Sequence, residues 1–458
     1  MYTDDTIAAI ATAQGEGSIS IVRLSGPQSL TIAEGITRCP IPTLSGRPTH
    51  TIVHGFVTDQ GRDIDEVLIL VMRAPHTFTG EDVVEIQGHG GPVSARRVLS
   101  CVLKAGARAA EPGEFTRRAF LNGRIDLVQA EAVLDLVRSS SDRAAEAALQ
   151  QLEGRLSNEL EAIYDDLISA AADLAAVLDF PEEEIHPQVQ ESAVQVLSRV
   201  RTKIQDLLNT WNEGRILRTG AFVVIAGMTN VGKSTLLNTL LNYNRAIVSP
   251  IHGTTRDFIE ESYCLNGIPV RLVDTAGIRS SSCELEQEGI RRSGEQVAKA
   301  DLQLYMVDAS QPLSDSEASS LRSKTRENCI VVLNKADLGL RIHARDLPGL
   351  DVVTTSLVDG TGLDVLRRLM GKKVECCMGG KTESSSHATI AERHRKLLQS
   401  AANEVDAAMD KLASGDEEGQ FIASEAVRVA AESVAQILGR QYCESLLDGI
   451  FSRFCIGK

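Results

Sequence analysis

The first 120 residues combine short apolar runs with frequent turn-forming residues. Apolar runs at residues 19–24, 51–57, 67–72 and 83–87 are each bounded by Gly, Pro or Asp. This pattern is typical of β-strands separated by turns. We therefore predict that residues 1–120 form an α+β domain.

The pattern changes after residue 120 and returns near the end of the chain. Residues 121–218 are rich in Ala, Leu, Glu and Gln, with apolar positions at the spacing of amphipathic helices. Residues 219–379 alternate apolar β runs with helical stretches, which predicts a parallel doubly wound sheet. Residues 380–458 resume the helical pattern, so we expect one helical domain interrupted by an inserted α/β domain.

A glycine-rich motif marks the first β run of the inserted domain. Residues 227–234 read Gly-Met-Thr-Asn-Val-Gly-Lys-Ser, which matches the phosphate-binding pattern G-x-x-x-x-G-K-S between a β run and a helical segment. The glycines allow backbone N–H groups to wrap phosphates at a helix N-terminus, where the helix dipole favours anions. We expect Lys233 to reach the β- and γ-phosphates and Ser234 to bind Mg²⁺.

Three further motifs follow in the order of a GTPase. Asp-Thr-Ala-Gly at residues 274–277 ends a β run, and its aspartate can hold Mg²⁺ through water. Asn-Lys-Ala-Asp at residues 334–337 ends another, and Asp337 offers two acceptor oxygens to two donors on one edge of guanine, which favours GTP over ATP. Thr254 and Thr255 can supply hydroxyls to a switch segment ordered by γ-phosphate and Mg²⁺. The set resembles the translation-factor-like small GTPases, which implies a Ras-like P-loop GTPase domain.

Charge and composition restrict the partners. The chain has 47 basic and 62 acidic residues, a net charge of −15, which argues against a whole-chain electrostatic grip on nucleic acid. Residues 121–218 hold nine basic and 18 acidic groups, so the other segments are near neutral and can carry basic patches such as Arg393, Arg395 and Lys396. We expect a nucleic-acid partner to avoid the acidic segment.

Targeting and redox signals indicate a cytoplasmic protein. No run of 18 apolar residues occurs, so no membrane helix is expected, and acidic residues stand where a signal peptide would be basic. The nine cysteines are scattered without a CxxC pair, which disfavours a disulfide framework or a zinc ribbon.

Motifs outside the GTPase domain carry a resemblance to one family. They are Phe-Thr-Gly-Glu-Asp at 78–82, Gln-Gly-His-Gly-Gly-Pro at 87–92, Pro-Gly-Glu-Phe-Thr at 112–116 and Cys-Ile-Gly-Lys at 455–458. With Asn230 in the phosphate loop and Gly-Thr-Thr-Arg-Asp at 253–257, the chain resembles the bacterial tRNA uridine-modification GTPases, the MnmE or TrmE family, over essentially its whole length.

The resemblance implies a multidomain α+β and α/β architecture. It comprises an N-terminal α+β folate-binding domain, a helical domain and the inserted GTPase domain. The family implies a homodimer that binds a 5-formyltetrahydrofolate-type donor, with two GTPase domains meeting across K⁺ to activate hydrolysis. With an FAD-dependent partner, MnmG, it implies addition of an aminomethyl or carboxymethylaminomethyl group to C5 of the wobble uridine of certain tRNAs.

The resemblance also implies site residues. The position after Asp-x-x-Gly, where Ras-like enzymes orient water with Gln, is Ile278, and the matching catalytic residue is Glu286. Mg²⁺ would be held by Ser234 and Thr255, and K⁺ by Asn230, Ser249, Ile251 and Thr254. The full set expected to bind GTP is Asn230, Val231, Gly232, Lys233, Ser234, Thr235, Ser249, Thr254, Thr255, Asp274, Thr275, Ala276, Gly277, Asn334, Lys335, Asp337, Ser356 and Leu357.

In the N-terminal site, the family's folate-binding positions are Arg23, Glu81, Arg124 and Lys458, and Cys455 is the candidate for a role in the modification chemistry. Position 124 departs from the family, which more often has Lys there, and a planar guanidinium differs from a point charge. Ser356 and Leu357 stand where the guanine-contacting loop usually reads Ser-Ala.

Two other classes of function remain open from the residues. One is a GTP-switch binding module, such as a ribosome-assembly factor, against which the N-terminal motifs and the terminal Cys-Ile-Gly-Lys argue. The other is a stand-alone folate-dependent aminomethyltransferase with a regulatory GTPase domain. Retention of folate, association with ribosomal subunits and dependence on the flavoprotein partner would separate the three.

Overall fold

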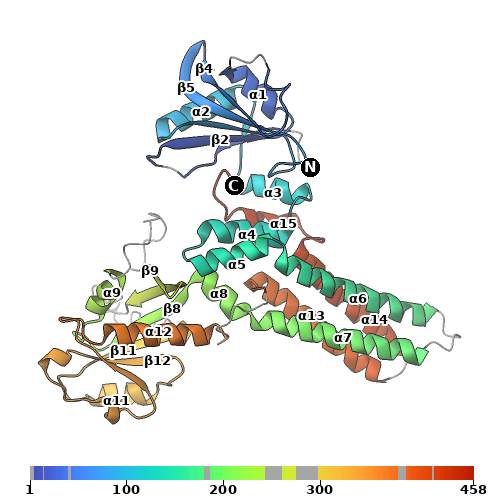
Figure 1. The fold of residues 1–458 in the computed structure, drawn as a ribbon. Helices are drawn as coiled ribbons and strands as arrows, with labels where there is room; N and C mark the ends of the chain where they lie inside the picture. The colour runs from blue at the N-terminus through green and yellow to red at the C-terminus, as the bar shows by residue number, and fades with distance from the viewer. Residues whose placement is uncertain are drawn as a thin grey trace, which may run out of the picture. The chain divides into compact units, whose positions relative to one another are not determined.

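A computed structural model of the 458 residues divides into two units. The structure describes residues 5–13, 15–39, 43–179, 186–242, 260–274, 298–379, 388–414 and 417–458. Unit one comprises residues 1–134 and 435–458, and unit two comprises residues 135–434 (Figure 1). The division of the chain into four segments stays a prediction.

Unit one is built on a seven-stranded sheet in the order β3-β4-β5-β6-β2-β1-β7. All neighbours in this sheet pair antiparallel except β1 and β7. The four predicted strands lie within β2, β4, β5 and β6. The strands are β1 (Ile7–Ile10), β2 (Ile19–Ser25), β3 (Thr37–Arg38), β4 (Thr51–Asp59), β5 (Arg62–Met72), β6 (Val83–His89) and β7 (Arg108–Ala109).

One face of this sheet packs against α1 (Ser29–Ile36) and α2 (Pro92–Lys104). Side chains alternate between faces along each strand, and the alternate residues that point to the helices form the core, including Val53, Ile69 and Ile86. The opposite face keeps large apolar side chains exposed, namely Ile19 (60%), Ile52 (64%) and Leu68 (44%). Phe115 of the helix at residues 114–121 packs against Ile7 and Ala9 on this second face, so only part of the face is exposed.

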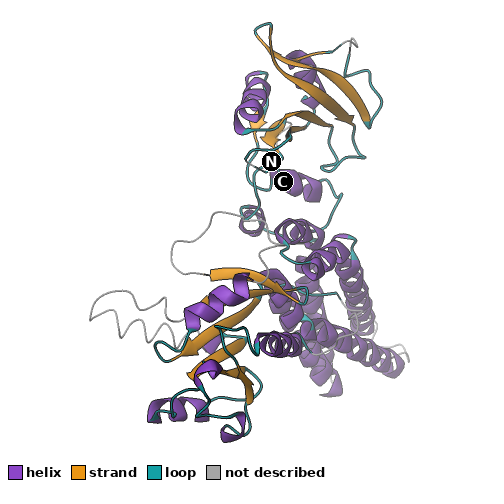
Figure 2. Cartoon of the chain, turned by 60° about the vertical axis from the view of Figure 1, so that its left-hand side comes forward, coloured by secondary structure: helices purple, strands orange, loops and turns teal. Residues whose placement is uncertain are grey.

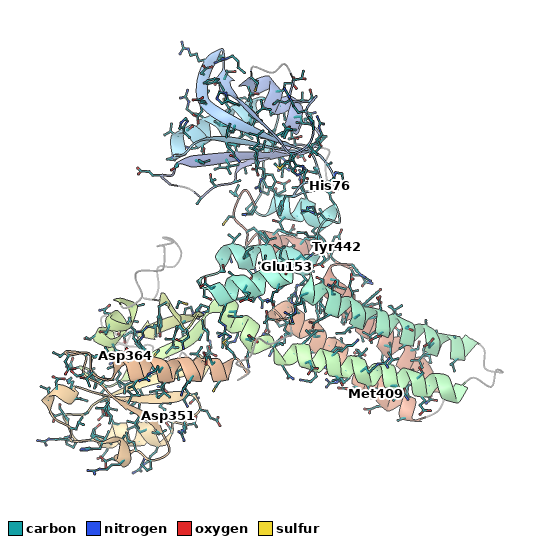
Figure 3. All side chains as sticks on the ribbon, viewed as in Figure 1. His76, Glu153, Asp351, Asp364, Met409 and Tyr442 are labelled. Atoms are coloured by element: carbon teal, nitrogen blue, oxygen red, sulfur yellow. The ribbon has the colours of Figure 1, made fainter. Side chains whose placement is uncertain are left out.

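The two ends of the chain meet within unit one. Helices α3 (Glu114–Leu121) and α15 (Glu444–Phe451) contact one another, and Arg117 of α3 donates to Asp448 at 3.0 Å and to Glu444 at 2.5 Å. The ring of Tyr442, labelled in Figure 3, stands edge-on to that of Phe120 at 5.4 Å. The C-terminal tail then reaches β1, where a Cβ at Gly457 would overlap the carbonyl oxygen of Ile10.

Unit two contains a group of long helices, and α7 packs against both α6 and α13 (Figure 1). Apolar residues at helical spacing, such as Leu160, Ile163 and Leu167, are fully buried there, as the sequence pattern predicts. The helices are α5 (Asp142–Leu152), α6 (Arg155–Asp179), α7 (His186–Asn209), α8 (Trp211–Thr219) and α13 (Glu392–Ser414); α4 (Leu127–Arg138) and α14 (Glu417–Leu438) contain the points at which the two units divide.

The remainder of unit two is a doubly wound α/β domain. Its six-stranded sheet has the order β13-β12-β11-β8-β10-β9, and all pairs are parallel except β9 with β10. Figure 2 shows its strands among helices. The predicted fold class is therefore confirmed. The elements are β8 (Ala221–Gly227), α9 (Lys233–Asn242), β9 (Glu260–Leu265), β10 (Ile268–Asp274), β11 (Leu302–Asp308), α11 (Asp315–Arg322), β12 (Cys329–Asn334), η2 (Ala336–Leu338), η3 (Ala344–Asp346), β13 (Asp351–Thr354) and α12 (Leu363–Cys377).

Strand β8 is the point at which the sheet's winding reverses. The chain passes from β8 to β9 and β10 on one side, then crosses to β11, β12 and β13 on the other. Ligands of open α/β sheets bind outside the carboxyl ends of the strands at such a point. The topology therefore places a ligand crevice where β8 ends, at the glycine-rich motif.

Helix α8 enters the α/β domain beside the returning chain. Thr210, Gly214 and Arg218 recur every four residues, on one face of the helix. Thr210 Oγ1 donates to Ala388 O at 3.0 Å and Arg218 Nη1 donates to Ile390 O at 2.8 Å. A Cβ at Gly214 would lie 2.6 Å from Ile390 O. The outgoing and returning segments are thus bonded together at the base of the domain.

Candidate functional site

The phosphate loop joins β8 to α9 through backbone conformations that favour glycine. Gly227, Asn230 and Gly232 have φ values of 145°, 62° and 104°. A Cβ at Gly227 would overlap the carbonyl oxygen of Met306, and one at Gly232 would lie 2.6 Å from Asn334 Nδ2. The loop can therefore pass close to its neighbours only with glycine at both positions, and it delivers the chain to a helix N-terminus suited to anions.

Lys233 is the first residue of α9 and folds back over the loop. Its Nζ donates to Met228 O at 2.6 Å and to Gly227 O at 3.1 Å. The residue is only 7% exposed, so these carbonyl oxygens help to offset the cost of burying the ammonium group. The group is thereby held at the mouth of the phosphate loop.

Ser234 and Asp274 bring two oxygen ligands together from different elements. The hydroxyl of Ser234, on α9, donates to Asp274 Oδ2 at the end of β10 at 2.7 Å. A hydroxyl and a carboxylate form a hard oxygen donor set of the kind that Mg²⁺ prefers. The pair therefore fits the predicted Mg²⁺ position beside the phosphate loop.

The base-side motif is bonded directly to the phosphate loop. Asn334 is 3% exposed, and its Nδ2 donates to Val231 O at 2.8 Å. The hydroxyl of Thr355 approaches Asn334 Oδ1 at 3.4 Å. Lys335, with φ 65°, donates from Nζ to Asp308 Oδ2 at 2.7 Å. One buried amide thus links the two halves of the nucleotide site.

Three further residues of the predicted site lie on the loops beyond β12 and β13. Asp337 is exposed on η2, where its carboxylate is accessible to a ligand. Ser356 is fully buried and its N–H donates to Thr361 O at 3.0 Å. Leu357 is half-buried, and its Cδ1 would lie 3.4 Å from a Cβ at Gly232.

Part of the predicted nucleotide site falls outside the described residues. This applies to the switch and catalytic positions, which are Ser249, Ile251, Thr254, Thr255, Thr275, Ala276, Gly277, Ile278 and Glu286. Asn230 is therefore the described member of the predicted K⁺ site, and it is exposed, as are Ser234 and Thr235 at the start of α9. Within the described ranges, no group of three or more His, Cys, Asp or Glu side chains that could hold a metal ion is present.

The second candidate site lies on the β2 strand of unit one. Arg23 Nε donates to Glu85 Oε1 at 2.8 Å, and its guanidinium lies 5.9 Å and 5.7 Å from the ring centroids of Phe78 and Phe115. Its Nη1 also reaches Gly457 O at 3.5 Å. A cation framed by two aromatic rings is thus brought against the C-terminal tail.

Glu81 is held by a buried ionic network next to Arg23. Ser25, on the same side of β2 as Arg23, donates to Glu81 Oε2 at 2.6 Å. Arg118 Nη1 lies 3.2 Å and 3.3 Å from the two Glu81 oxygens. Arg118 is 3% exposed and also bonds to Asp5 and Glu114. The Glu81 carboxylate is therefore fixed in place by two donors.

Arg118 is a residue that sequence reasoning missed. It follows the Pro-Gly-Glu-Phe-Thr motif in the sequence, but no spacing distinguishes a buried arginine from an exposed one. Burial raises the pKa of Glu114, yet hydrogen bonds and charges from Arg108 and Arg118 outweigh it and hold that pKa below its ordinary value. The same balance lowers the pKa of Asp5, so both carboxylates stay ionised around the buried guanidinium.

The remaining predicted residues of this site are less enclosed. Lys458 is half-buried and its N–H donates to Cys455 O at 3.3 Å, while the Cys455 side chain is exposed. Arg124 is exposed at the end of α3, and within the described part no hydrogen bond joins its side chain to Arg23 or Glu81. The structure thus brings together Arg23, Glu81 and the C-terminal tail, and Arg124 is exposed on the loop that follows the helix at residues 114–121.

The doubly wound sheet, the phosphate loop at its switch point and the Asn-Lys-x-Asp turn define unit two as carrying a P-loop GTPase domain. Comparison with known proteins identifies the family. A model described as the MnmE helical domain matches residues 127–455, and one described as the GTP-binding protein TrmE N-terminus matches residues 6–124.

Full-length relatives agree with these matches. The tRNA modification GTPase MnmE of Geobacter metallireducens is 44% identical over 466 residues, covering 100% of both chains. That of Geobacillus kaustophilus is 44% identical over 99% of each. The chain belongs to the tRNA modification GTPase MnmE family, and it is a GTPase.

Two solved structures are more distant likenesses. A crystal structure of an Aquifex aeolicus Era variant bound to GDP·AlF4⁻ is 25% identical, with a TM-score of 0.27, and the match covers 40% of this chain and 66% of that one. The FeoB G-domain of Methanococcus jannaschii is 24% identical, with a TM-score of 0.25, and the match covers 34% of this chain and 98% of that one. Among the described helices, none has the length and apolar character of a membrane span.

Proposed function

We propose that this chain is a K⁺-stimulated GTPase that drives modification of tRNA. With an FAD-dependent partner protein of the MnmG type, it adds an aminomethyl-type group to C5 of the wobble uridine of certain tRNAs. The one-carbon unit comes from a 5-formyltetrahydrofolate-type donor. The observation that carries the proposal is the presence of two separate candidate sites, the phosphate loop of unit two and the Arg23–Glu81 site of unit one, in a chain whose relatives are named tRNA modification GTPases.

In the nucleotide site, described residues can position and neutralise phosphate. Lys233 would exchange the carbonyl oxygens of Gly227 and Met228 for the β- and γ-phosphates, and Ser234 with Asp274 would hold Mg²⁺. Exposed Asn230, at the tip of the loop, offers its amide oxygen to K⁺. A monovalent cation near the β–γ bridge supplies positive charge where negative charge develops in the transition state. Glu286 polarises the water in place of the missing glutamine.

In unit one, the enclosed charges suit a folate. The Glu81 carboxylate, held by Ser25 and Arg118, can accept hydrogen bonds from N–H groups on the edge of a pterin ring. Phe78 and Phe115 provide aromatic surface beside it. Arg23 and Lys458 would supply positive charge to the acidic end of the donor. Cys455 would take part in the modification chemistry.

A homodimer would cover the exposed part of the second face of the seven-stranded sheet. Ile19, Ile52 and Leu68 expose apolar side chains on this face, and monomeric proteins rarely leave such patches open without a partner. Pairing of two copies through unit one would then bring two GTPase domains into one assembly. Contact between these two domains is then proposed to activate hydrolysis.

The first experiment compares GTP hydrolysis by the purified chain in K⁺ and in Na⁺. We expect turnover to rise in K⁺, and Asn230→Ala to remove that stimulation because the amide oxygen is lost. Glu286→Ala is expected to lose turnover and to keep GTP affinity, because the residue acts on water and not on the nucleotide. Normal turnover in Glu286→Ala would contradict its catalytic role.

The modification itself is tested by mass analysis of wobble uridines in a strain that lacks this protein. Restoring the wild-type gene should restore the modified base, whereas Arg23→Ala should not. Unchanged wobble uridines in the deletion strain would contradict the proposal and favour a GTP-switch binding module.

A further inference from the structure

Asp308 stands at the carboxyl end of β11, in the strand between the two halves of the nucleotide site. Its Oδ2 accepts a hydrogen bond from Lys335 Nζ at 2.7 Å. Its Oδ1 accepts from the Ser310 hydroxyl at 2.6 Å and from the Ser310 N–H at 3.0 Å. Both oxygens are therefore engaged, and the carboxylate is held in one orientation by its own loop.

The sheet register shows what this contact spans. Asp308 pairs with Asn334 across β11 and β12, and on its other side β11 pairs with β8, where Met306 lies opposite Gly227 of the phosphate loop. Lys335 follows Asn334 directly at the end of β12, yet its ammonium group lies at the end of β11, beside Asp308. Its side chain therefore runs along the carboxyl edge of the sheet from β12 to β11, in the direction of the phosphate loop.

The backbone of Lys335 is fixed as firmly as its ammonium group. The residue has φ 65°, a conformation that costs energy for a residue with a Cβ. Its neighbours are both bonded, since the N–H of Ala309 donates to Asn334 O at 2.8 Å and the N–H of Ala336 donates to Thr355 O at 3.1 Å. A lysine side chain held at both ends has already lost most of its rotamer freedom before a ligand arrives.

We propose that Asp308 is a positioning residue for guanine-nucleotide binding. It holds the Lys335 ammonium at the end of β11, so that the methylene stem lies stretched along the site and presents apolar surface to the face of the base. Long cationic side chains commonly use their stems in this way. The inference rests on the proposed role of Lys335 in the guanine site.

The charge state of Asp308 supports this geometry. Burial raises the pKa of its carboxyl, but the hydrogen bonds from Lys335 and Ser310 outweigh it and hold the pKa below its ordinary value. The side chains of Lys335 and Asp308 are 31% and 21% exposed, so water screens the pair only in part. The carboxylate is therefore ionised at neutral pH, where it attracts the ammonium group.

The test is a double-mutant cycle on Asp308 and Lys335, with nucleotide affinity measured by equilibrium titration of the full-length chain. Asp308→Ala should weaken GTP and GDP binding about tenfold, the loss of one well-placed partly buried contact, or about 1.4 kcal/mol. In a Lys335→Ala background the same substitution should change affinity less than about twofold, because the residue through which Asp308 acts is already gone. Ser310→Ala is the matched control, since it removes a neighbour of Asp308 and leaves the ion pair.

Inosine and guanosine nucleotides separate this role from recognition of the base edge. The Lys335 stem faces the ring and not its 2-amino group, so Asp308→Ala should weaken GTP and ITP by the same factor. Asp337→Ala, which acts on the base edge, should instead reduce the preference for GTP over ITP. A change in that preference in Asp308→Ala would contradict the proposed role.

Other outcomes are also decisive. Unchanged GTP affinity in Asp308→Ala, or an equal loss in the Lys335→Ala background, would overturn the inference. Wild-type affinity in Lys335→Ala alone would contradict the proposed role of Lys335 itself, which is a separate failure. Asp308→Asn keeps the size and the acceptor for Ser310 but removes the charge, and it replaces Asp308→Ala in the cycle if that variant does not fold.

Discussion

The two candidate sites of this protein are built by different means. The nucleotide site is formed by backbone groups at the carboxyl ends of parallel strands, with positive φ at Gly227, Asn230 and Gly232. The N-terminal site is formed by charged side chains on an antiparallel sheet, centred on the buried Arg118. The first depends on local chain geometry, whereas the second depends on charges that must be buried together.

The two constructions also differ in sequence range. The phosphate loop spans residues 227–234, so the residues expected to bind phosphate are consecutive in the sequence. The N-terminal site joins Arg118 to Asp5 across 113 positions and Arg23 to Gly457 across 434. A local site can be recognised by spacing, and a site of this second kind becomes visible only after folding.

Arg118→Ala should be the most damaging substitution in unit one. It leaves Glu81 without its arginine and leaves Asp5 and Glu114 with Arg108 alone, and removing one partner from a buried ionic network costs about 3–5 kcal/mol. Hydrogen–deuterium exchange read peptide by peptide should show lost protection in unit one, together with lost folate binding. GTP affinity should remain unchanged if the two sites are built independently.

Arg117→Ala is the control for that substitution. Arg117 pairs with Glu444 and Asp448, whose side chains are 68% and 65% exposed, and ion pairs with such partners contribute about 1 kcal/mol or less. Equal losses of protection in the two variants would show that the ionic network around Arg118 stabilises unit one no more than an exposed ion pair does.

Gly227→Ala should be the substitution that most damages the nucleotide site, as Arg118→Ala should be for the N-terminal site. The residue has φ 145°, and an added Cβ would overlap the Met306 carbonyl, so we expect a loss of about 2–4 kcal/mol from strain and overpacking. GTP affinity should fall by at least about 100-fold because the loop can no longer close around phosphate. Isothermal titration with GTP and thermal denaturation would measure both effects.

Gly349→Ala provides the matched control, because this glycine has φ 85° with nothing within 4 Å of an added Cβ. It should cost only about 1–2 kcal/mol of backbone strain and leave GTP affinity intact. A comparable loss of affinity in both variants would mean that backbone strain, and not the clash beside the phosphate loop, controls the site.

The sequence predicted most of this architecture because it is periodic. The strands at residues 19–24, 51–57, 67–72 and 83–87 lie within observed strands, and the α/β domain has the expected parallel sheet. Strand β9 was missed because Glu260–Leu265 is half polar and is paired only along one edge. The strands β3 and β7 have two residues each, which is too short to show an alternation of apolar and polar positions.

The sites were predictable to unequal extents for the same physical reason. Lys233, Ser234 and Asp274 stand in fixed motifs, and the structure places them together. Asp308 and Arg118 were missed. The role of an acid at a strand end, or of an arginine in a helix, depends on partners elsewhere in the chain, and these are known only from the folded structure. The switch and catalytic positions lie outside the described residues, so their roles remain predictions.

Acid should affect the N-terminal site through the carboxylates that Arg108 and Arg118 hold ionised. Asp5 and Glu114 have folded-state pKa values below their ordinary values of 3.8 and 4.5. Such groups contribute stability that is fully present above the unfolded pKa and is lost as pH falls through the folded pKa. Protection of unit one should therefore be constant from neutral pH down to about pH 5 and decline below about pH 4.5.

The phosphate loop offers the comparison, because its geometry is set by glycine conformations and not by titrating groups. Hydrogen exchange of peptides covering residues 108–121 and 221–232, corrected for the intrinsic effect of pH, should show the first losing protection before the second. In Arg118→Ala the acid-dependent decline of the first peptide should shrink but not vanish, since Arg108 remains to lower the two pKa values. A decline of equal size with and without Arg118 would show that Arg118 does not contribute to the acid sensitivity of unit one, and would contradict the proposed electrostatic difference between the two sites.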